Sequence, residues 1–244
     1  KTPLEKTMHL NGTQSSLPFQ LGIVMLGLSA AFGGTLVERN GPRWAMTVAL
    51  VCFSSGFLIS ALGAGTKQYW LIVLGYGFVG GIGLGIGYIS PVSTLIKWFP
   101  DRPGMATGIA IMGFGGGALI ASPWSAQMLE SFGADSSGIA LAFLVHGLTY
   151  AVFMLLGVLL VRVPRPKERA DGGPDGARGV QVSAREAVRT PQFWLLWVAL
   201  CMNVTAGIGI LEKAAPMITD FFADTSVPVS ATAAAGFVAL LSAA

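Results

Sequence analysis

The chain has 244 residues, of which 53% are hydrophobic and only 11% are charged, whereas ordinary soluble domains carry roughly 25% charged residues. The formal net charge is +3, but the charges lie in short loops and form no basic face, which argues against nucleic acid as a partner. Cys52 and Cys201 both lie in apolar runs, so neither a disulfide framework nor a metal site has its ligands. We therefore expect an all-α protein of the lipid bilayer, with no cofactor and no metal.

Uncharged apolar runs of about 20 residues predict helices that cross a bilayer, because only internal hydrogen bonding satisfies the backbone in lipid. The predicted spans, with the last one incomplete, are residues 17–37, 44–64, 69–96, 104–124, 138–161, 193–211 and 229–244. The third run would be about 42 Å long as a helix, more than a hydrocarbon core of roughly 30 Å, so we expect it to tilt or to bend at Pro91. Because residues 1–16 lack an initiating Met and the last run stops short, we expect a chain cut at both ends.

The loops of one side carry most of the basic residues. These loops are the turns at 38–43 and 97–103 and the segment 162–189, which is rich in Pro, Gly and charge and is typical of a flexible linker. The positive-inside rule places this side in the cytoplasm.

Glycines follow the third and fourth spans at helical spacing. The first three recur every four residues and so lie on one face, where a partner helix can approach the backbone. The other three fall within about 40° of one another on a helical wheel. The glycines predicted to pack against other helices are Gly77, Gly81, Gly85, Gly104, Gly108 and Gly115.

The turn between the first two spans carries a recognisable pattern. Its spacing is G-x-x-x-[DE]-[RK]-x-G-x-[RK], formed by Gly34, Glu38, Arg39, Gly41 and Arg43. The pattern resembles the cytoplasmic loop between spans two and three of the major facilitator superfamily, although Pro42 replaces a residue that is often basic there. In that register one span is missing, and six spans would precede the linker, as in the six-plus-six plan of the superfamily. These charges are candidates for a cytoplasmic gate; alternatively, they only fix the topology.

Two further stretches, residues 97–124 (KWFPDRPGMATGIAIMGFGGGALIASPW) and 190–197 (TPQFWLLW), resemble the oxalate:formate antiporter branch, which is related to the monocarboxylate transporters. The resemblance implies an incomplete major facilitator fold with spans two to seven and the start of eight. It divides the chain into a half bundle lacking its first span (1–162), a central cytoplasmic linker (163–191) and the start of the second half (192–244).

The same resemblance implies a function and a location. We expect a multi-pass protein of the cell (plasma or inner) membrane, monomeric when complete, that moves a small organic anion such as oxalate, formate or a similar monocarboxylate. Alternating access by antiport or by coupling to protons would drive it. A different facilitator substrate, such as a drug or a sugar, and a non-transporting membrane scaffold are the alternatives.

Candidate site residues follow from position and from the resemblance. Tyr88 lies at the edge of the first glycine face, and the branch has aromatic residues lining its carboxylate site at the places of Tyr88 and Phe114. Asn203 lies mid-span and binds substrate or bonds to a neighbouring helix. His146, an ionisable group in a membrane helix, is a candidate proton site, with the same alternative. Tyr76 points about 140° away from Gly81 on an α-helical wheel and is interpreted as packing.

Enzyme motifs are absent or misplaced. Residues 75–80 match G-x-G-x-x-G, but they lie inside a predicted span with no turn and no following strand. The sequence has no H-E-x-x-H, G-x-S-x-G or P-loop motif, so we expect neither an enzyme nor an ATP-driven pump. A buried anion needs a countercharge, and no Lys or Arg lies deep in a predicted span, so we expect a basic residue mid-span in the second half.

Overall fold

The computed structural model describes residues 2–133, 135–162, 186, 188–199 and 201–202. Apart from turns and short connections, these residues are helical. The elements are α1 (Thr2–Met8), α2 (Gly12–Asn40), α3 (Pro42–Gly65), α4 (Tyr69–Ile72), the π-helix η1 (Val73–Gly80), α5 (Gly81–Trp98), α6 (Pro103–Phe132) and α7 (Ser136–Leu160). The all-α fold class is confirmed over this part of the chain.

Among the described residues, four stretches are long and apolar enough to cross a membrane, namely Gly12–Asn40, Pro42–Gly65, Tyr69–Trp98 and Ser136–Leu160. They contain the predicted spans at 17–37, 44–64 and 69–96 and nearly all of the one at 138–161, and α6 covers the predicted run 104–124. Of the next predicted span, residues 193–199 and 201–202 are helical. Residues 203–211 and 229–244 lie outside the described residues.

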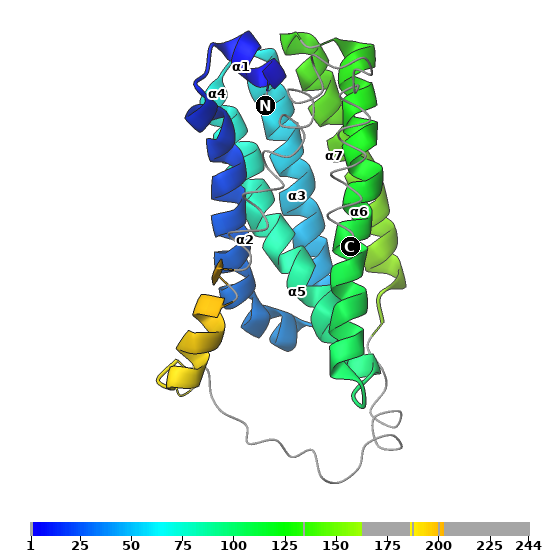
Figure 1. The fold of residues 1–244 in the computed structure, drawn as a ribbon. Coiled ribbons are helices and arrows are strands. Elements are labelled where there is room, and N and C mark those ends of the chain that lie inside the picture. Colours follow the sequence, from blue (N-terminus) through cyan, green and yellow to red (C-terminus); the bar gives the residue numbers. More distant parts are fainter. Residues whose placement is uncertain (1, 134, 163–185, 187, 200, 203–244) are drawn as a thin grey trace, which may run out of the picture. The chain divides into compact units, whose positions relative to one another are not determined.

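Contacts divide the chain into two parts, Lys1–Ile111 with Gln127–Glu168 and Met112–Ala126 with Arg169–Ala244. In the first part, α3 packs against both α7 and the α4–η1–α5 helix, and α2 packs against η1 and α5 (Figure 1). The stretch from Tyr69 to Trp98 therefore lies between α2 and α3. The domain boundaries expected at 162 and 192 stay predictions.

Part of the first half of the predicted third span, residues 73–80, is wound as a π-helix, which the sequence does not predict. Such segments are rare and usually short, and they are frequent at functional sites. In η1, Gly75 faces α3 so closely that an added Cβ would lie 2.5 Å from the carbonyl oxygen of Gly56 and 2.6 Å from Oγ of Ser60. Real Cβ atoms essentially never come this close. The two helix backbones therefore touch, and a glycine is needed on each side.

A second backbone contact joins η1 and α5 to α2. An added Cβ on Gly77 would lie 2.9 Å from the carbonyl oxygen of Pro18, and one on Gly81 would lie 2.8 Å from that of Gly22. One on Gly85 would overlap the Leu26 carbonyl oxygen and the Ser29 hydroxyl. The glycines spaced every four residues thus share one face of the η1–α5 helix, and that face packs against α2.

The glycines of α6 differ. An added Cβ on Gly104 or Gly108 would meet no heavy atom within 4 Å among the described residues. At these two positions the prediction of close helix packing is therefore not met in this part of the chain, because no described helix covers this face. The surroundings of Gly115 lie outside the description.

The turn between α2 and α3 depends on Gly41. This residue has φ 86° and ψ 163°, its N–H donates to the carbonyl oxygen of Val37 at 2.9 Å, and Pro42 then begins α3. Residues with a Cβ almost never occupy this region of backbone conformation. Glycine thus allows α2 to end and α3 to start within one residue.

Replacing Gly41 by alanine should destabilise the protein by about 1–3 kcal/mol, because the added Cβ makes this backbone conformation strained. Thermal unfolding in detergent measures the effect, with size-exclusion chromatography after heating as the readout of folded protein. Gly104→Ala is the matched control, since nothing lies within 4 Å of the added methyl group. Equal unfolding temperatures for the two variants would contradict the strain argument.

Candidate functional site

A cavity of about 170 Å³ lies between α2, α3, the η1–α5 helix and α7. We call it the aromatic cavity, because rings from several helices form much of its wall. Its lining residues are Phe19, Gly22, Ile23, Phe53, Phe57, Tyr76, Gly80, Gly81, Leu84 and Tyr150. By volume it has room for several water molecules or for one small polar molecule.

Phe57 of α3 is the centre of this wall. Its ring is 7% exposed, and the rings around it have their centroids within 6.4 Å of its own. These rings belong to Phe53, Tyr76, Phe143, His146 and Tyr150. Gly147 of α7 makes the approach possible, because an added Cβ there would lie 2.9 Å from Cβ of Phe57.

His146 is buried behind the aromatic cavity. Its ring stacks on Phe57 with the planes 21° apart, and its centroid lies 5.6 Å from that of Tyr150. Nδ1 lies 2.8 Å from the carbonyl oxygen of Ala142, one turn earlier in the same helix. A carbonyl oxygen only accepts hydrogen bonds, so Nδ1 carries the hydrogen, and a second proton would enter the ring at Nε2. The role of His146 as a proton site stays a prediction.

Two tyrosines on this wall were missed as site residues by the sequence analysis. Tyr76 was interpreted as packing because an α-helical wheel turns it away from Gly81, yet both residues line the aromatic cavity. The π-helix is the physical reason, since its i→i+5 hydrogen bonds widen the turn and bring residues five apart toward one face. Within the described part of the chain, the hydroxyls of Tyr76 and Tyr150 have no hydrogen-bond partner, so both can donate to a bound molecule or to water.

The structure does not bring together the three residues that were predicted to bind substrate. Tyr88 lies half-buried in α5 and does not line the aromatic cavity. Phe114 lies in α6, but its side chain is outside the description, and Asn203 lies outside the described residues. Their roles stay predictions.

At the other end of the bundle, which carries the loop pattern, two side chains form hydrogen bonds with the residues that follow α7. Nε of Arg43 donates to the carbonyl oxygen of Val161 at 2.8 Å, and Nε1 of Trp98 donates to that of Arg162 at 2.9 Å. Side chains from the start of α3 and the end of α5 thus hold the two residues that follow α7. Trp98 was not predicted for this role, because nothing in its local sequence indicates a partner 64 residues away.

The remaining members of the loop pattern are more open. Glu38 and Arg39 are exposed at the end of α2, and neither forms an ion pair with another described residue. Gly34 is half-buried one turn earlier, where an added Cβ would lie 3.6 Å from Cδ1 of Ile89. The two charges are therefore accessible to other groups on this side of the membrane.

Comparison with known proteins places these features in a family. The family model described as "Major Facilitator Superfamily" matches residues 2–244. The chain is 27% identical over 211 residues to the "Uncharacterized MFS-type transporter YhjX" of Escherichia coli (strain K12), covering 84% of this chain and 50% of the relative.

Two relatives carry names that describe a substrate. The "Oxalate:formate antiporter" of Oxalobacter formigenes is 25% identical over 220 residues, covering 88% of this chain and 49% of the relative. The human "Monocarboxylate transporter 11" is 27% identical over 167 residues, covering 68% and 34%. The chain spans about half the length of the first two relatives.

The family model covers nearly the whole chain, and the membrane-crossing helices and the loop pattern agree with it. The expectation of a multi-pass membrane protein is thereby confirmed. This chain belongs to the Major Facilitator Superfamily of membrane transporters.

Proposed function

We propose that the protein is a secondary active transporter of a small organic anion, such as oxalate, formate or a similar monocarboxylate, and that it works by alternating access. The observation that carries the proposal is the match to an oxalate:formate antiporter, which is 25% identical over a region that covers 88% of this chain. The similarity to a monocarboxylate transporter supports the same substrate class. Antiport and coupling to protons both fit this proposal.

The packing of the first part of the chain supports alternating access. In this mechanism one bundle rocks against another around a fixed site, so each bundle has to move as one body. The backbone contacts of the η1–α5 helix with α2 and α3 resist sliding inside the bundle. The bonds from Arg43 and Trp98 attach the end of α7 to the same body.

Uptake and counterflow in vesicles that contain the full-length protein test the proposal directly. Oxalate, formate, lactate and pyruvate are the substrates to compare, with protein-free vesicles as the blank. We expect exchange of at least one of these anions. Failure to exchange any of them would favour a drug or a sugar as the substrate, and failure with every solute would favour a scaffold.

The proposal also requires a countercharge for the anion. A full-length sequence with no basic residue deep in any span would contradict it, because a buried anion without a partner is too costly.

Tyr88 is our proposed hydrogen-bond donor to the substrate carboxylate. Its half-buried position in α5 supports this role, and Phe114 and Asn203 remain proposed neighbours in the same site. Tyr88→Phe removes one hydrogen bond to a charged group, which is worth about 1.5–3 kcal/mol. The Michaelis constant for uptake should therefore rise roughly tenfold or more, with unchanged expression. Unchanged kinetics would assign Tyr88 to packing.

His146 is our proposed proton site, and the burial of this ionisable ring in a membrane-crossing helix, stacked on Phe57, supports it. If transport is coupled to protons through this ring, uptake by the parent protein should rise as the external pH falls. His146→Gln should then flatten that profile. A variant that keeps the parent's pH profile but unfolds at a lower temperature would show a purely structural role.

A further inference from the structure

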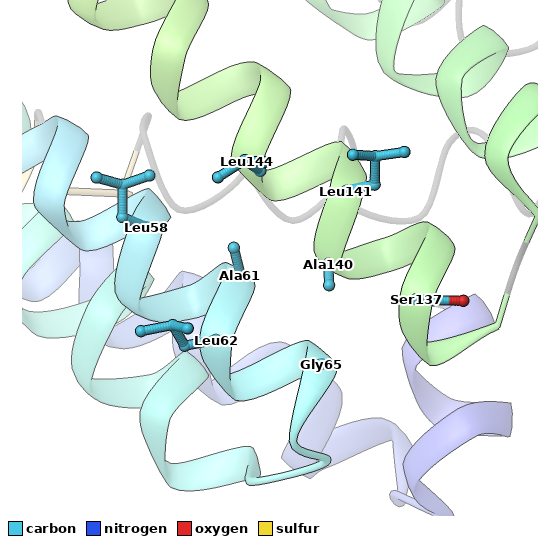
Figure 2. Close-up of a pocket in the computed structure, with 8 residues that line it drawn as sticks. All are labelled: Leu58, Ala61, Leu62, Gly65, Ser137, Ala140, Leu141 and Leu144. Atoms are coloured by element: carbon cyan, nitrogen blue, oxygen red, sulfur yellow. The ribbon is translucent and has the colours of Figure 1, made fainter.

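An open groove runs between α3 and α7 at the membrane face opposite to the loop pattern. Its volume is about 540 Å³, and Figure 2 shows the residues that line it. They are Leu58, Ala61, Leu62 and Gly65 of α3 and Ser137, Ala140, Leu141 and Leu144 of α7. We call it the α3–α7 groove.

The α3–α7 groove has the length and the apolar lining of a site for one lipid chain. It extends over eight residues of each helix, or about 10 Å at a rise of 1.5 Å per residue, and so stays within one leaflet of a core roughly 30 Å thick. Its wall is hydrocarbon except for the Ser137 hydroxyl. Leu62 is 65% exposed and Leu141 42%, so the groove is open along its side.

The end of the groove is fixed and carries charges of both signs. Oγ of Ser136 donates to the carbonyl oxygen of Ala64, which ties the start of α7 to the end of α3. Beside it, the Asp135 carboxylate accepts a hydrogen bond from Ser137, a groove residue, and another from the Gly138 N–H. These bonds lower the pKa of Asp135, so the exposed carboxylate is ionised at neutral pH. Lys67 is exposed two residues beyond Gly65.

We propose that the α3–α7 groove binds one acyl chain of a zwitterionic phospholipid with an ammonium headgroup, such as phosphatidylethanolamine. The apolar wall holds the chain, and the Asp135 carboxylate attracts the headgroup ammonium. Lys67 supplies the opposite charge for the phosphate. The inference depends on the membrane location of the chain and not on which substrate it carries.

Photolabelling of the full-length protein in vesicles tests this proposal. The probes are phosphatidylethanolamine and phosphatidylglycerol that carry the same diazirine on one acyl chain, and mass spectrometry maps the labelled peptides. We expect several-fold more labelling of residues 58–65 and 137–144 by phosphatidylethanolamine than by phosphatidylglycerol. Equal labelling by both probes, at the level of the exposed face at 152–160, would mean ordinary boundary lipid and would overturn the proposal.

Matched variants separate the chain contact from the headgroup contact. Ala140→Leu fills the groove and should reduce its labelling several-fold, whereas Val152→Leu, on an exposed part of the same helix, should not. Asp135→Asn should remove the preference between the two lipids. If Ala140→Leu does not fold, Asp135→Asn still decides the question. A cross-link between two copies through this groove would assign it to self-association and would overturn the lipid assignment.

Discussion

Replacing Phe57 by alanine should lower the stability of the protein by about 3–5 kcal/mol, the range measured for buried Phe→Ala changes. For a chain of this size, that corresponds to a fall in unfolding temperature of roughly 6–20 °C. The reason is the position of the ring, which is 7% exposed and contacts rings of α3, η1 and α7. Helix association in lipid rests largely on such van der Waals packing. The variant also removes the surface on which His146 stacks.

Phe153→Ala is the matched control, because this phenylalanine is 68% exposed on α7. It removes the same number of atoms from a place where they contact few others. Thermal unfolding in detergent compares the two variants, and uptake in vesicles shows whether the aromatic cavity matters for transport. Similar unfolding temperatures for both would mean that the Phe57 cluster does not hold α3, η1 and α7 together.

The membrane-crossing helices were predictable from the sequence because the bilayer imposes a simple rule. A backbone in lipid has to be helical or part of a closed barrel, so an uncharged run such as residues 44–64 indicates the position of α3 within a few residues. The face of the Gly77–Gly81–Gly85 series also followed from spacing alone. An ordinary α-helical wheel places these three glycines on the correct face, because residues four apart lie close to one face in a π-helix as well as in an α-helix.

The aromatic cavity was not predictable in the same way. Its wall joins Phe57, Tyr76 and Tyr150, residues that are up to 93 positions apart in the sequence, and only the packing of three helices brings them together. The π-helix added a local error, because it changes the direction of Tyr76 without a sequence signal that a wheel can detect. His146 was singled out as a candidate because a titratable group in an apolar run is conspicuous, whereas a tyrosine there is not.

The open glycines of α6 show a further limit of reading a spacing pattern. The same reasoning was applied to Gly81 and to Gly104, but only the first has a helix against it in the described part of the chain. Spacing indicates which face of a helix is able to accept a close neighbour. It does not indicate which helix packs against that face, since the partner depends on residues elsewhere in the fold.

Replacing Gly85 by alanine should separate α2 from α5 and reduce both stability and uptake. The new Cβ would overlap the Leu26 carbonyl oxygen and the Ser29 hydroxyl. The hydroxyl is the end of a rotatable side chain, but the carbonyl is part of the helix backbone, so α2 has to move as a whole. Overpacking of this kind costs about 1–3 kcal/mol. Because Tyr88 lies one turn further along α5, its position changes with that helix.

Gly27→Ala is the matched control for this change, since it adds the same methyl group to α2 where nothing lies within 4 Å. It should leave stability and uptake at the parent level or raise stability slightly, because alanine favours a helix over glycine by about 1 kcal/mol. Adding Ser29→Ala to Gly85→Ala removes the side-chain overlap and leaves the one with Leu26. The double variant should therefore recover only part of the lost stability. Full recovery would show that the serine hydroxyl, and not the backbone contact, sets the distance between α2 and α5.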